Sequence, residues 1–278
     1  MIDNNIFNNL FVVPILNLLV TFFKFFLYIK APGALGFAII ALVGLVRLVF
    51  HPFFKQQMET AHKMQQLKPH LDHISKKHKA DPKKLQQEQM RLYQEAGINP
   101  AAGCVFMIIQ IPIFIALYRT LSLFFVHDAK VNIVTELNKH LYWPVLKIQT
   151  IDPWFLGFNL AVTPANGGRW YYYAIPLITG VLQYLQVVTS TPPAAKAIEK
   201  KTEGKDEKKD TSGDFQKAMN TQMKYVFPLM IGYFSYTLPI GLSLYWNVFS
   251  LFSIIQNKRI NPNLKLNLTT KLDEKETK

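Results

Sequence analysis

Cysteine is almost absent from this chain of 278 residues, since Cys104 is the only one. A single cysteine excludes an internal disulfide framework. Charged residues are also scarce, at 18% against about 25% in an average soluble domain. Half of the residues are hydrophobic, which excludes a disordered chain. Yet Lys and Arg outnumber Asp and Glu by 31 to 18. This combination is typical of a protein with apolar segments in a bilayer and basic segments beside it.

Acidic residues are missing from every long apolar stretch of the sequence. A proton-coupled pump or an intramembrane metal hydrolase needs a carboxylate there. The motifs H-E-x-x-H and G-x-S-x-G are absent, and the first ten residues lack the Lys or Arg of a cleavable signal peptide. Five histidines between His51 and His78 have no accompanying cysteine, so we interpret them as a solvated face and not a metal site. We therefore expect no enzyme, no cofactor and no metal.

The apolar blocks predict five membrane-spanning helices, because about 20 residues of helix cross a bilayer core. The last block is too long for one span, and Leu238-Pro239-Ile240-Gly241 supplies a break near its middle. The expected spans are residues 33–54, 103–125, 170–190, 223–238 and 240–256. The sequence thus predicts an all-α membrane protein with a five-transmembrane-helix core.

The N-terminal segment, residues 1–32, contains an apolar stretch at 8–30 that polar residues interrupt. Asn17, Thr21, Lys24 and Tyr28 follow at spacings of 4, 3 and 4, which puts them on one helical stripe. A lysine is costly at depth in a membrane. We expect an amphipathic helix in the membrane interface. A sixth span with a polar seam is the alternative.

Lys and Arg in the connecting segments predict the orientation. Residues 52–102, 193–222 and 257–278 together hold 22 of them, whereas residues 1–32 and 126–169 hold six. The N-terminus and the 126–169 loop are therefore expected outside, and the C-terminus in the cytoplasm of a bacterial plasma membrane.

The expected cytoplasmic segments differ in kind. Residues 55–98 predict a helical hairpin, because Met64, Leu67, Leu71 and Ile74 form a seam at spacings of 3, 4 and 3 and Asp81-Pro82 can cap a second helix. Residues 191–222, rich in Lys, Glu, Asp and Gly, predict a flexible loop. Residues 257–278 form a basic tail.

Arg47 is the first candidate for function, because it lies inside an expected span and no span carries an acidic residue. Such a charge needs water, backbone carbonyls or a ligand. Snorkelling toward the cytoplasmic end of the span, about seven residues away, is one interpretation. The other is a water-filled cavity that is open to the cytoplasm.

Polar stripes on other spans could line such a cavity. Gln110 lies in the second span, and the stripes comprise Thr179, Gln183, Gln186 and Ser190 in the third and Ser243, Asn247 and Ser250 in the fifth. Residues of these types also join membrane helices by mutual hydrogen bonds, so this alternative stays open for each of them.

Three strings of the sequence resemble one family. Gly44–Gln57 (GLVRLVFHPFFKQQ), Asn99–Tyr118 (NPAAGCVFMIIQIPIFIALY) and Gly241–Gln256 (GLSLYWNVFSLFSIIQ) are similar to core spans of YidC/Oxa-type membrane protein insertases. The resemblance covers roughly residues 8–260 and contains no large periplasmic domain. It implies a hydrophilic groove open to cytoplasm and lipid, with Arg47 as the groove arginine and Gln110, Gln183 and Trp246 near it. Where relatives often have Asn in the last span, this chain has Ser250.

The resemblance also implies partners. Clients would be nascent membrane proteins with short translocated tails, received from the ribosome or the Sec translocon, and no sequence-specific nucleic-acid binding is expected. A small-solute transporter or channel is the alternative function, although the internal repeats typical of transporters are not found. An assembly scaffold or chaperone with the same groove is a further alternative.

Overall fold

The computed structural model of the chain is mainly helical and describes residues 5–78, 81–97, 102–125, 133–190 and 222–259. The expected flexible loop 191–222 and basic tail 257–278 lie almost wholly outside the described residues. The chain divides into two compact units. The first comprises Met1–Phe50, Met107–Tyr184 and Pro228–Phe252, and the second His51–Phe106, Leu185–Phe227 and Ser253–Lys278.

Helices lie in all five ranges that the sequence predicts as membrane-spanning. They are α2 (Ala34–Val49), α6 (Ala102–Phe125), α8 (Ala174–Ser190), α11 (Phe227–Thr237) and α12 (Ile240–Arg259). A 3-10 turn, Trp170–Tyr173, precedes α8, and a π-helix, Gln222–Val226, precedes α11. The first helix ends at Val49, earlier than residue 54, because a new helix starts at His51 with Pro52 in its first turn, where no backbone N–H is needed.

By length and apolar composition, one helix of the described residues is long enough to cross a membrane, and it is Asn8–Tyr28. A second candidate arises when Ala34–Val49 and His51–Thr60, which meet at a short break, are counted together. The number of five spans therefore stays a prediction.

The core of the first unit begins with the N-terminal helix. A π-helical turn, Asn8–Val12, leads directly into α1 (Val13–Tyr28), with Pro14 in the first turn. Leu16, Leu19, Val20 and Phe23 lie on one face of α1 and are fully buried in a cluster with apolar residues of α2, α6 and α12. The apolar face of α1 is thus part of the core.

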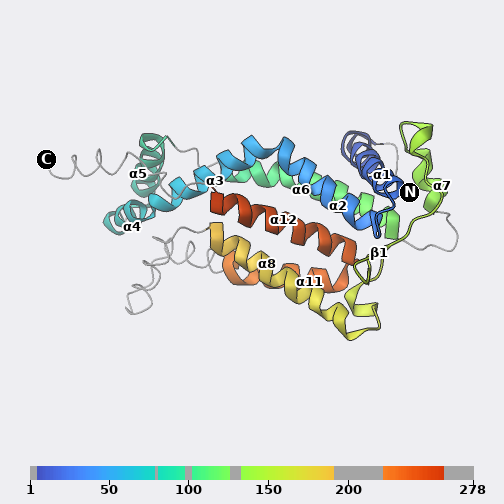
Figure 1. Ribbon diagram of the computed structural model, residues 1–278. Helices are drawn as coiled ribbons and strands as arrows, with labels where there is room; N and C mark the ends of the chain where they lie inside the picture. The colour runs from blue at the N-terminus through green and yellow to red at the C-terminus, as the bar shows by residue number, and fades with distance from the viewer. Residues whose placement is uncertain (1–4, 79–80, 98–101, 126–132, 191–221, 260–278) are drawn as a thin grey trace. The chain divides into compact units, whose positions relative to one another are not determined.

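Helix α12 lies between α2 and α6 on one side and α8 and α11 on the other (Figure 1). Toward α6, Trp246 stacks on Phe114 with ring centroids 5.4 Å apart. Toward α8, Ser250 Oγ donates a hydrogen bond of 3.1 Å to Gln183 Oε1. The side chains of α12 therefore connect the two halves of the first unit.

The break between α11 and α12 falls at Leu238 and Pro239, where the sequence predicts it. A helix start leaves backbone N–H groups without partners inside the helix. Here the N–H of Ile240 donates to the carbonyl of Val162 at 3.0 Å, and the N–H of Gly241 donates to that of Leu160 at 2.9 Å. The segment before α8 therefore caps α12.

A two-stranded hairpin belongs to the same segment. Strands β1 (Trp154–Phe155) and β2 (Phe158–Asn159) pair antiparallel, and Gly157 has the positive φ that the tight turn requires. The ring of Phe155 lies directly on Gly36 of α2, since a Cβ at Gly36 would come within 2.2 Å of it. The remaining elements of the segment are α7 (Ile133–Lys139) and short 3-10 turns at Pro144–Leu146 and Pro164–Asn166.

The second unit contains three polar helices, α3 (His51–Gln66), α4 (Lys68–Lys77) and α5 (Pro82–Glu95). The predicted seam is present, because Leu67 and Leu71 are buried against Leu92 of α5, with Met64 and Ile74 packed beside them. The break between α3 and α4 was not predicted. Its signal is Pro69, which occupies the first turn of α4.

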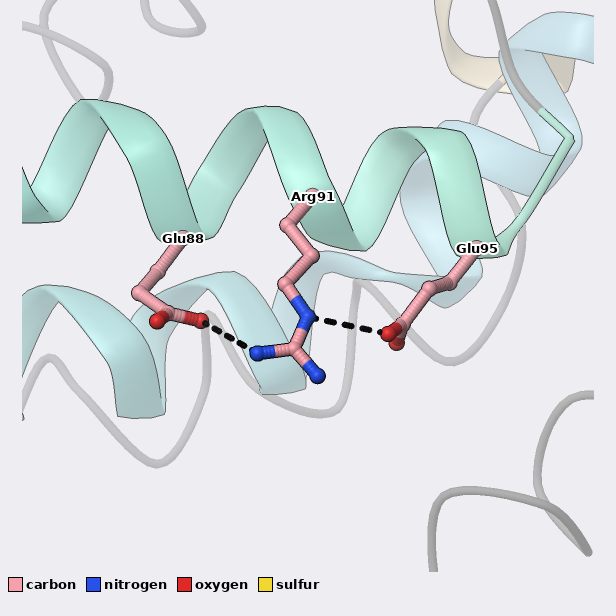
Figure 2. A network of polar contacts seen from close by, with 3 residues as sticks. All are labelled: Glu88, Arg91 and Glu95. Carbon is pink, nitrogen blue, oxygen red and sulfur yellow. Dashed lines mark hydrogen bonds and ion pairs between the residues drawn. The ribbon is translucent and has the colours of Figure 1, made fainter.

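Local polar interactions define α5. Asp81 is its N-cap, and its carboxylate accepts hydrogen bonds from the backbone N–H groups of Lys83 and Lys84, both at 3.1 Å, as the sequence predicts. On the exposed face, Arg91 lies between Glu88 and Glu95, one turn to either side (Figure 2). Leu92, the residue after Arg91, turns toward the seam and is buried there.

Candidate functional site

The Arg47 side chain lies in the last turn of α2 and is buried, with 6% of its surface exposed. Its Nη2 donates a hydrogen bond of 2.9 Å to the carbonyl oxygen of Phe249 on α12. Its guanidinium carbon lies 3.8 Å from the centroid of the Phe249 ring. A carbonyl and an aromatic face both attract a cation without carrying a charge. The positive charge is therefore held between α2 and α12 by neutral groups.

The partner of Arg47 defines its level along the bundle. Helix α12 runs over 20 residues, Ile240–Arg259, and Phe249 is the tenth of them. At 1.5 Å per residue, the helix is about 30 Å long and Phe249 lies about halfway along it. The guanidinium is bonded at this middle level, although Arg47 itself is only two residues from the end of α2. This contact favours a charge inside the bundle over simple snorkelling.

A buried hydroxyl cluster joins α8, α11 and α12. Ser235 Oγ donates a hydrogen bond of 3.1 Å to Thr179 Oγ1 and lies 2.7 Å from Ser243 Oγ. All three residues are at most 1% exposed. Next to the cluster, the backbones of α8 and α11 pass each other at Gly180 and Gly232, where a Cβ at Gly232 would lie in ordinary contact, 3.7 Å from the Gly180 Cα. Thr179 and Ser243 thus form the interhelical hydrogen bonds that the sequence offered as the alternative.

Gln183 and Ser250 make a second interhelical contact, between α8 and α12. Ser250 is 2% exposed and Gln183 is 8% exposed. Four of the nine candidate residues are thereby engaged in bonds that position α8 and α12. Phe249, the residue before Ser250, carries the carbonyl that binds Arg47. The same turn of α12 therefore faces both α2 and α8.

Trp246 and Asn247 are half-buried on α12. Trp246 stacks on Phe114 of α6 at an interplanar angle of 17°. The Oδ1 atom of Asn247 is buried and accepts no hydrogen bond from the described part of the chain. A buried amide oxygen without a donor is costly unless water or a ligand reaches it. The Oδ1 atom of Asn247 is therefore a candidate acceptor for a hydrogen bond from a group outside the chain.

Two candidate residues are not brought together with the others. Gln110 lies in α6, and its side chain is outside the described residues. Gln186 lies in the part of α8 that belongs to the second unit, and its side chain is half-buried there. Within the described ranges, no three His, Cys, Asp or Glu side chains are placed to hold a metal ion.

Two residues of the site were missed from the sequence. Phe249 was overlooked because its contribution is a backbone carbonyl and a ring face, which no polar pattern signals. Ser235 was overlooked because it is the only hydroxyl on its face of α11. A signal existed for Ser235, since it lies eight residues before Ser243 and just before the predicted break at Pro239.

The polar stripe of α1 has partners within the protein. Asn17 Nδ2 donates to the carbonyl of His140 at 3.0 Å, and Asn17 Oδ1 accepts from the N–H of Tyr142 at 2.8 Å. Lys24 Nζ donates to the carbonyls of Val145 and Lys147. The stripe thus binds residues 140–147. These contacts explain the polarity of Asn17 and Lys24, whereas the Thr21 hydroxyl bonds within α1 and Tyr28 is exposed.

Comparison with known proteins identifies the class to which this bundle belongs. Residues 26–267 match the model of the 60Kd inner membrane protein family. The match covers most of the chain, so the chain belongs to this family, which is that of the YidC/Oxa-type insertases. The resemblance read from the three sequence strings is confirmed.

Individual relatives agree with this assignment. The chain is 35% identical over 244 residues to inner membrane ALBINO3-like protein 2, chloroplastic, of Chlamydomonas reinhardtii, covering 86% of this chain and 52% of the relative. It is 31% identical to inner membrane protein ALBINO3, chloroplastic, of Arabidopsis thaliana, covering 82% and 46%. It is 29% identical to membrane protein insertase YidC of Oceanobacillus iheyensis, covering 93% and 85%. The chain thus spans about half the length of the chloroplast relatives it matches.

Proposed function

We propose that this protein is a membrane protein insertase and not an enzyme. It moves short polar segments of nascent membrane proteins into the bilayer through a hydrophilic groove open to cytoplasm and lipid. It receives clients from the ribosome, alone or together with the Sec translocon. The proposal rests on membership of the family and on the name of the bacterial relative, which is a membrane protein insertase.

The observation that carries the proposal is the position of Arg47. Its guanidinium binds halfway along α12, within a bundle of apolar helices whose sequences contain no Asp or Glu. A charge at the centre of a bilayer costs about 2.5–3.5 kcal/mol on insertion scales. A groove that admits water or an anionic client segment offsets this cost. The same groove lowers the cost of moving a client's polar residues past the apolar core.

Within this proposal, the candidate residues have two functions. Arg47, Gln110, Trp246 and Asn247 face the client. The hydrogen bonds of Thr179, Gln183, Ser243 and Ser250 fix the distance of α8 from α12 and so the width of the groove. Gln186 lies three residues after Gln183 on the polar stripe of α8.

The contacts of α1 support an interfacial location for this helix. Its C-terminal end leads into the start of α2. Near its N-terminal end, Asn8 Oδ1 accepts a hydrogen bond of 2.9 Å from Arg119, which is six residues, or about 9 Å, before the end of α6. The end of α6 and the start of α12 meet, because the Phe125 ring contacts Gly241.

Phe155 contacts the start of α2, and Leu160, five residues later, bonds the start of α12. Both ends of α1 are therefore tied near the same end of the bundle, although the helical stretch Asn8–Tyr28 is about 30 Å long. Such a helix crosses the end of the bundle, as expected of an interfacial helix and not of a sixth span.

The orientation completes the proposal. The N-terminus and the segment 126–169 lie outside the bacterial plasma membrane, and α3–α5 and the C-terminus lie in the cytoplasm, as the bias of Lys and Arg indicates. Single cysteines at His73 on α4 and Asn166 in the outer segment test this orientation in a Cys104→Ser protein. An impermeant thiol reagent applied to intact cells should label position 166 only. Labelling of position 73 instead would reverse the orientation.

Reconstitution tests the function itself. The protein is placed in liposomes with clients that differ only in the charge of a short translocated tail. Insertion of acidic tails should fall in Arg47→Ala and be largely retained in Arg47→Lys. Arg119→Ala is the matched control, because Arg119 also lies near a ring and a neutral acceptor but is close to the end of α6 and not at the middle of the bundle. Equal insertion of all tails by Arg47→Ala would refute the electrostatic role of Arg47.

A further inference from the structure

Exposed aromatic side chains gather in the segment between α7 and α8. Tyr142, Trp143, Trp154, Trp170 and Tyr173 are 52%, 60%, 46%, 84% and 54% exposed, and these five residues are called the aromatic belt below. Three of the four tryptophans of the chain belong to it. Large rings exposed in this number are unusual in a segment that faces only water. Trp and Tyr are enriched where a membrane meets water, because one end of each ring system is apolar and the other polar.

The segment that carries the belt is tied to the middle of α1 and to the first turns of α2 and α12. Lys24 and Asn17 of α1 bind the backbone of residues 140–147. The Phe155 ring lies on Gly36 in the first turn of α2. The carbonyls of 160 and 162 accept the first N–H groups of α12. The segment that carries the belt is therefore held beside the starts of α2 and α12.

The belt is continuous with the apolar outer faces of two helices. Tyr173, Leu177 and Val181 follow at intervals of four residues, so they share one face, and they are 54%, 69% and 50% exposed. Tyr173 also stacks on Tyr236, in the last turn of α11, with centroids 6.1 Å apart. An apolar helix face of this kind suits lipid chains. The aromatic rings at the end of this helix face then lie where the lipid acyl chains meet the headgroups.

We propose that the aromatic belt is embedded in the headgroup region of the phospholipid bilayer and anchors the segment 140–173 there. The inference rests on the membrane location within the proposed function. Exposed Arg169, whose Nη1 donates to the hydroxyl of Tyr171 at 3.0 Å, lies next to Trp170 and is a suitable partner for a lipid phosphate. The segment is thus a collar in the membrane surface and not a domain in the water outside.

Tryptophan fluorescence tests the proposal on the full chain in phospholipid vesicles. Three single-tryptophan proteins each keep Trp143, Trp154 or Trp170 and carry Phe at the other tryptophan positions. A fourth protein has Phe at all four positions and the change His73→Trp on the exposed surface of α4, as the water-exposed control. Quenching is measured with lipids brominated near the glycerol end or near the methyl end of the acyl chain. Iodide is added on both sides of the vesicles, so that protein orientation does not matter.

The belt tryptophans should be quenched more by shallow than by deep bromine. Iodide should quench them several-fold less than the tryptophan at position 73. Iodide quenching equal to that of the control, without quenching by either lipid, would overturn the proposal. Protection from iodide without any lipid quenching, together with crosslinks between copies at these positions, would also overturn it, because the belt would then be a protein interface.

Insertion of a client by the unsubstituted protein in the same vesicles separates this inference from the proposed function. If the quenching places the aromatic belt in water while the client is still inserted, the inference about the belt is overturned and the proposed function is not. A belt in lipid without insertion overturns the insertase proposal alone.

Discussion

Gly36 is the position at which the structure makes its sharpest stability prediction. A Cβ built there would lie 2.2 Å from two carbons of the Phe155 ring, whereas apolar carbons pack at about 3.5–4.0 Å. The ring would have to move by more than an ångström, and Phe155 is only 7% exposed. Overpacking of this kind costs about 1–3 kcal/mol. The change Gly36→Ala should therefore destabilise the protein, even though alanine is intrinsically the better helix residue.

The effect of Gly36→Ala on the free energy of unfolding should change sign when the Phe155 ring is removed. Phe155→Ala alone should destabilise by about 3–5 kcal/mol, because a buried ring leaves a cavity. In that background Gly36→Ala meets free space and gains up to about 1 kcal/mol of helix propensity. The double-mutant cycle should thus give a favourable coupling of about 1–4 kcal/mol between two residues more than a hundred positions apart.

Thermal unfolding in detergent, followed by near-ultraviolet circular dichroism, measures these effects. A loss of 1 kcal/mol corresponds to about 2–4 °C in Tm for a chain of this size. Gly44→Ala is the matched control on the same helix, because its Cβ would meet Phe252 at an ordinary 3.7 Å. It should not lower Tm in either background. If Gly36→Ala shifts Tm equally with and without the Phe155 ring, the packing of the β-hairpin against α2 is not as described.

Two further predictions concern residues 136–147 and their contact with α1. Asn17→Ala removes the hydrogen-bond partner of the His140 carbonyl and of the Tyr142 N–H. It should therefore lower the free energy of unfolding by about 1–3 kcal/mol and speed hydrogen exchange at the Tyr142 amide. Thr21→Ala is the control and should do neither, because the Thr21 hydroxyl bonds only within α1. The hydrogen bond from Lys139 holds the pKa of the Glu136 carboxyl below its usual range. The stability that the Glu136 carboxylate contributes to the folded protein is therefore present above the usual pKa of a carboxyl group. It is lost as the pH falls through the lowered pKa of Glu136. Glu136→Gln should flatten this part of a Tm-against-pH profile, and an unchanged profile would contradict the assignment.

The helices were predictable because their signals are local. Apolar runs of helical length gave all five, Pro239 marked the break before α12, and Asp81-Pro82 marked the start of α5. Each signal acts within a few residues, so no knowledge of the rest of the chain was needed. The end of α2 at Val49 was missed because the apolar run continues past it, and only Pro52 indicates a new helix.

The contacts that build the site could not be predicted in the same way. Arg47 and Phe249 are 202 positions apart, and the bond uses a backbone carbonyl that every residue possesses. The packing of Phe155 on Gly36 is likewise a matter of shape between distant segments. For the polar stripes, the sequence left two interpretations open, since a hydroxyl that lines water and one that joins helices follow the same spacing. The bonds of Thr179 and Ser243 identify their partners, which spacing alone could not do.

The magnitude of the Arg47 effect depends on how wet its surroundings are. Opposite charges 4 Å apart attract by about 1 kcal/mol in bulk water and by about 4 kcal/mol at an effective dielectric constant of 20. A difference of 1.4 kcal/mol is about tenfold in an equilibrium. If Arg47 lies in the proposed groove and this groove is filled with water, Arg47→Ala should therefore reduce insertion of an acidic tail, relative to a neutral tail of equal length, by about fivefold.

A loss of acidic-tail insertion larger than fivefold, relative to the neutral tail, indicates a drier site around Arg47. The dependence of this ratio on salt distinguishes a wet site from a dry one, because ions screen exposed charges and reach buried charges poorly. A fivefold ratio that vanishes in high salt fits a wet groove beside α12. A larger ratio that resists salt means that the client's acid displaces water and lies directly against the guanidinium. A ratio of one at low salt leaves Arg47 as a structural residue that joins α2 to α12 through Phe249.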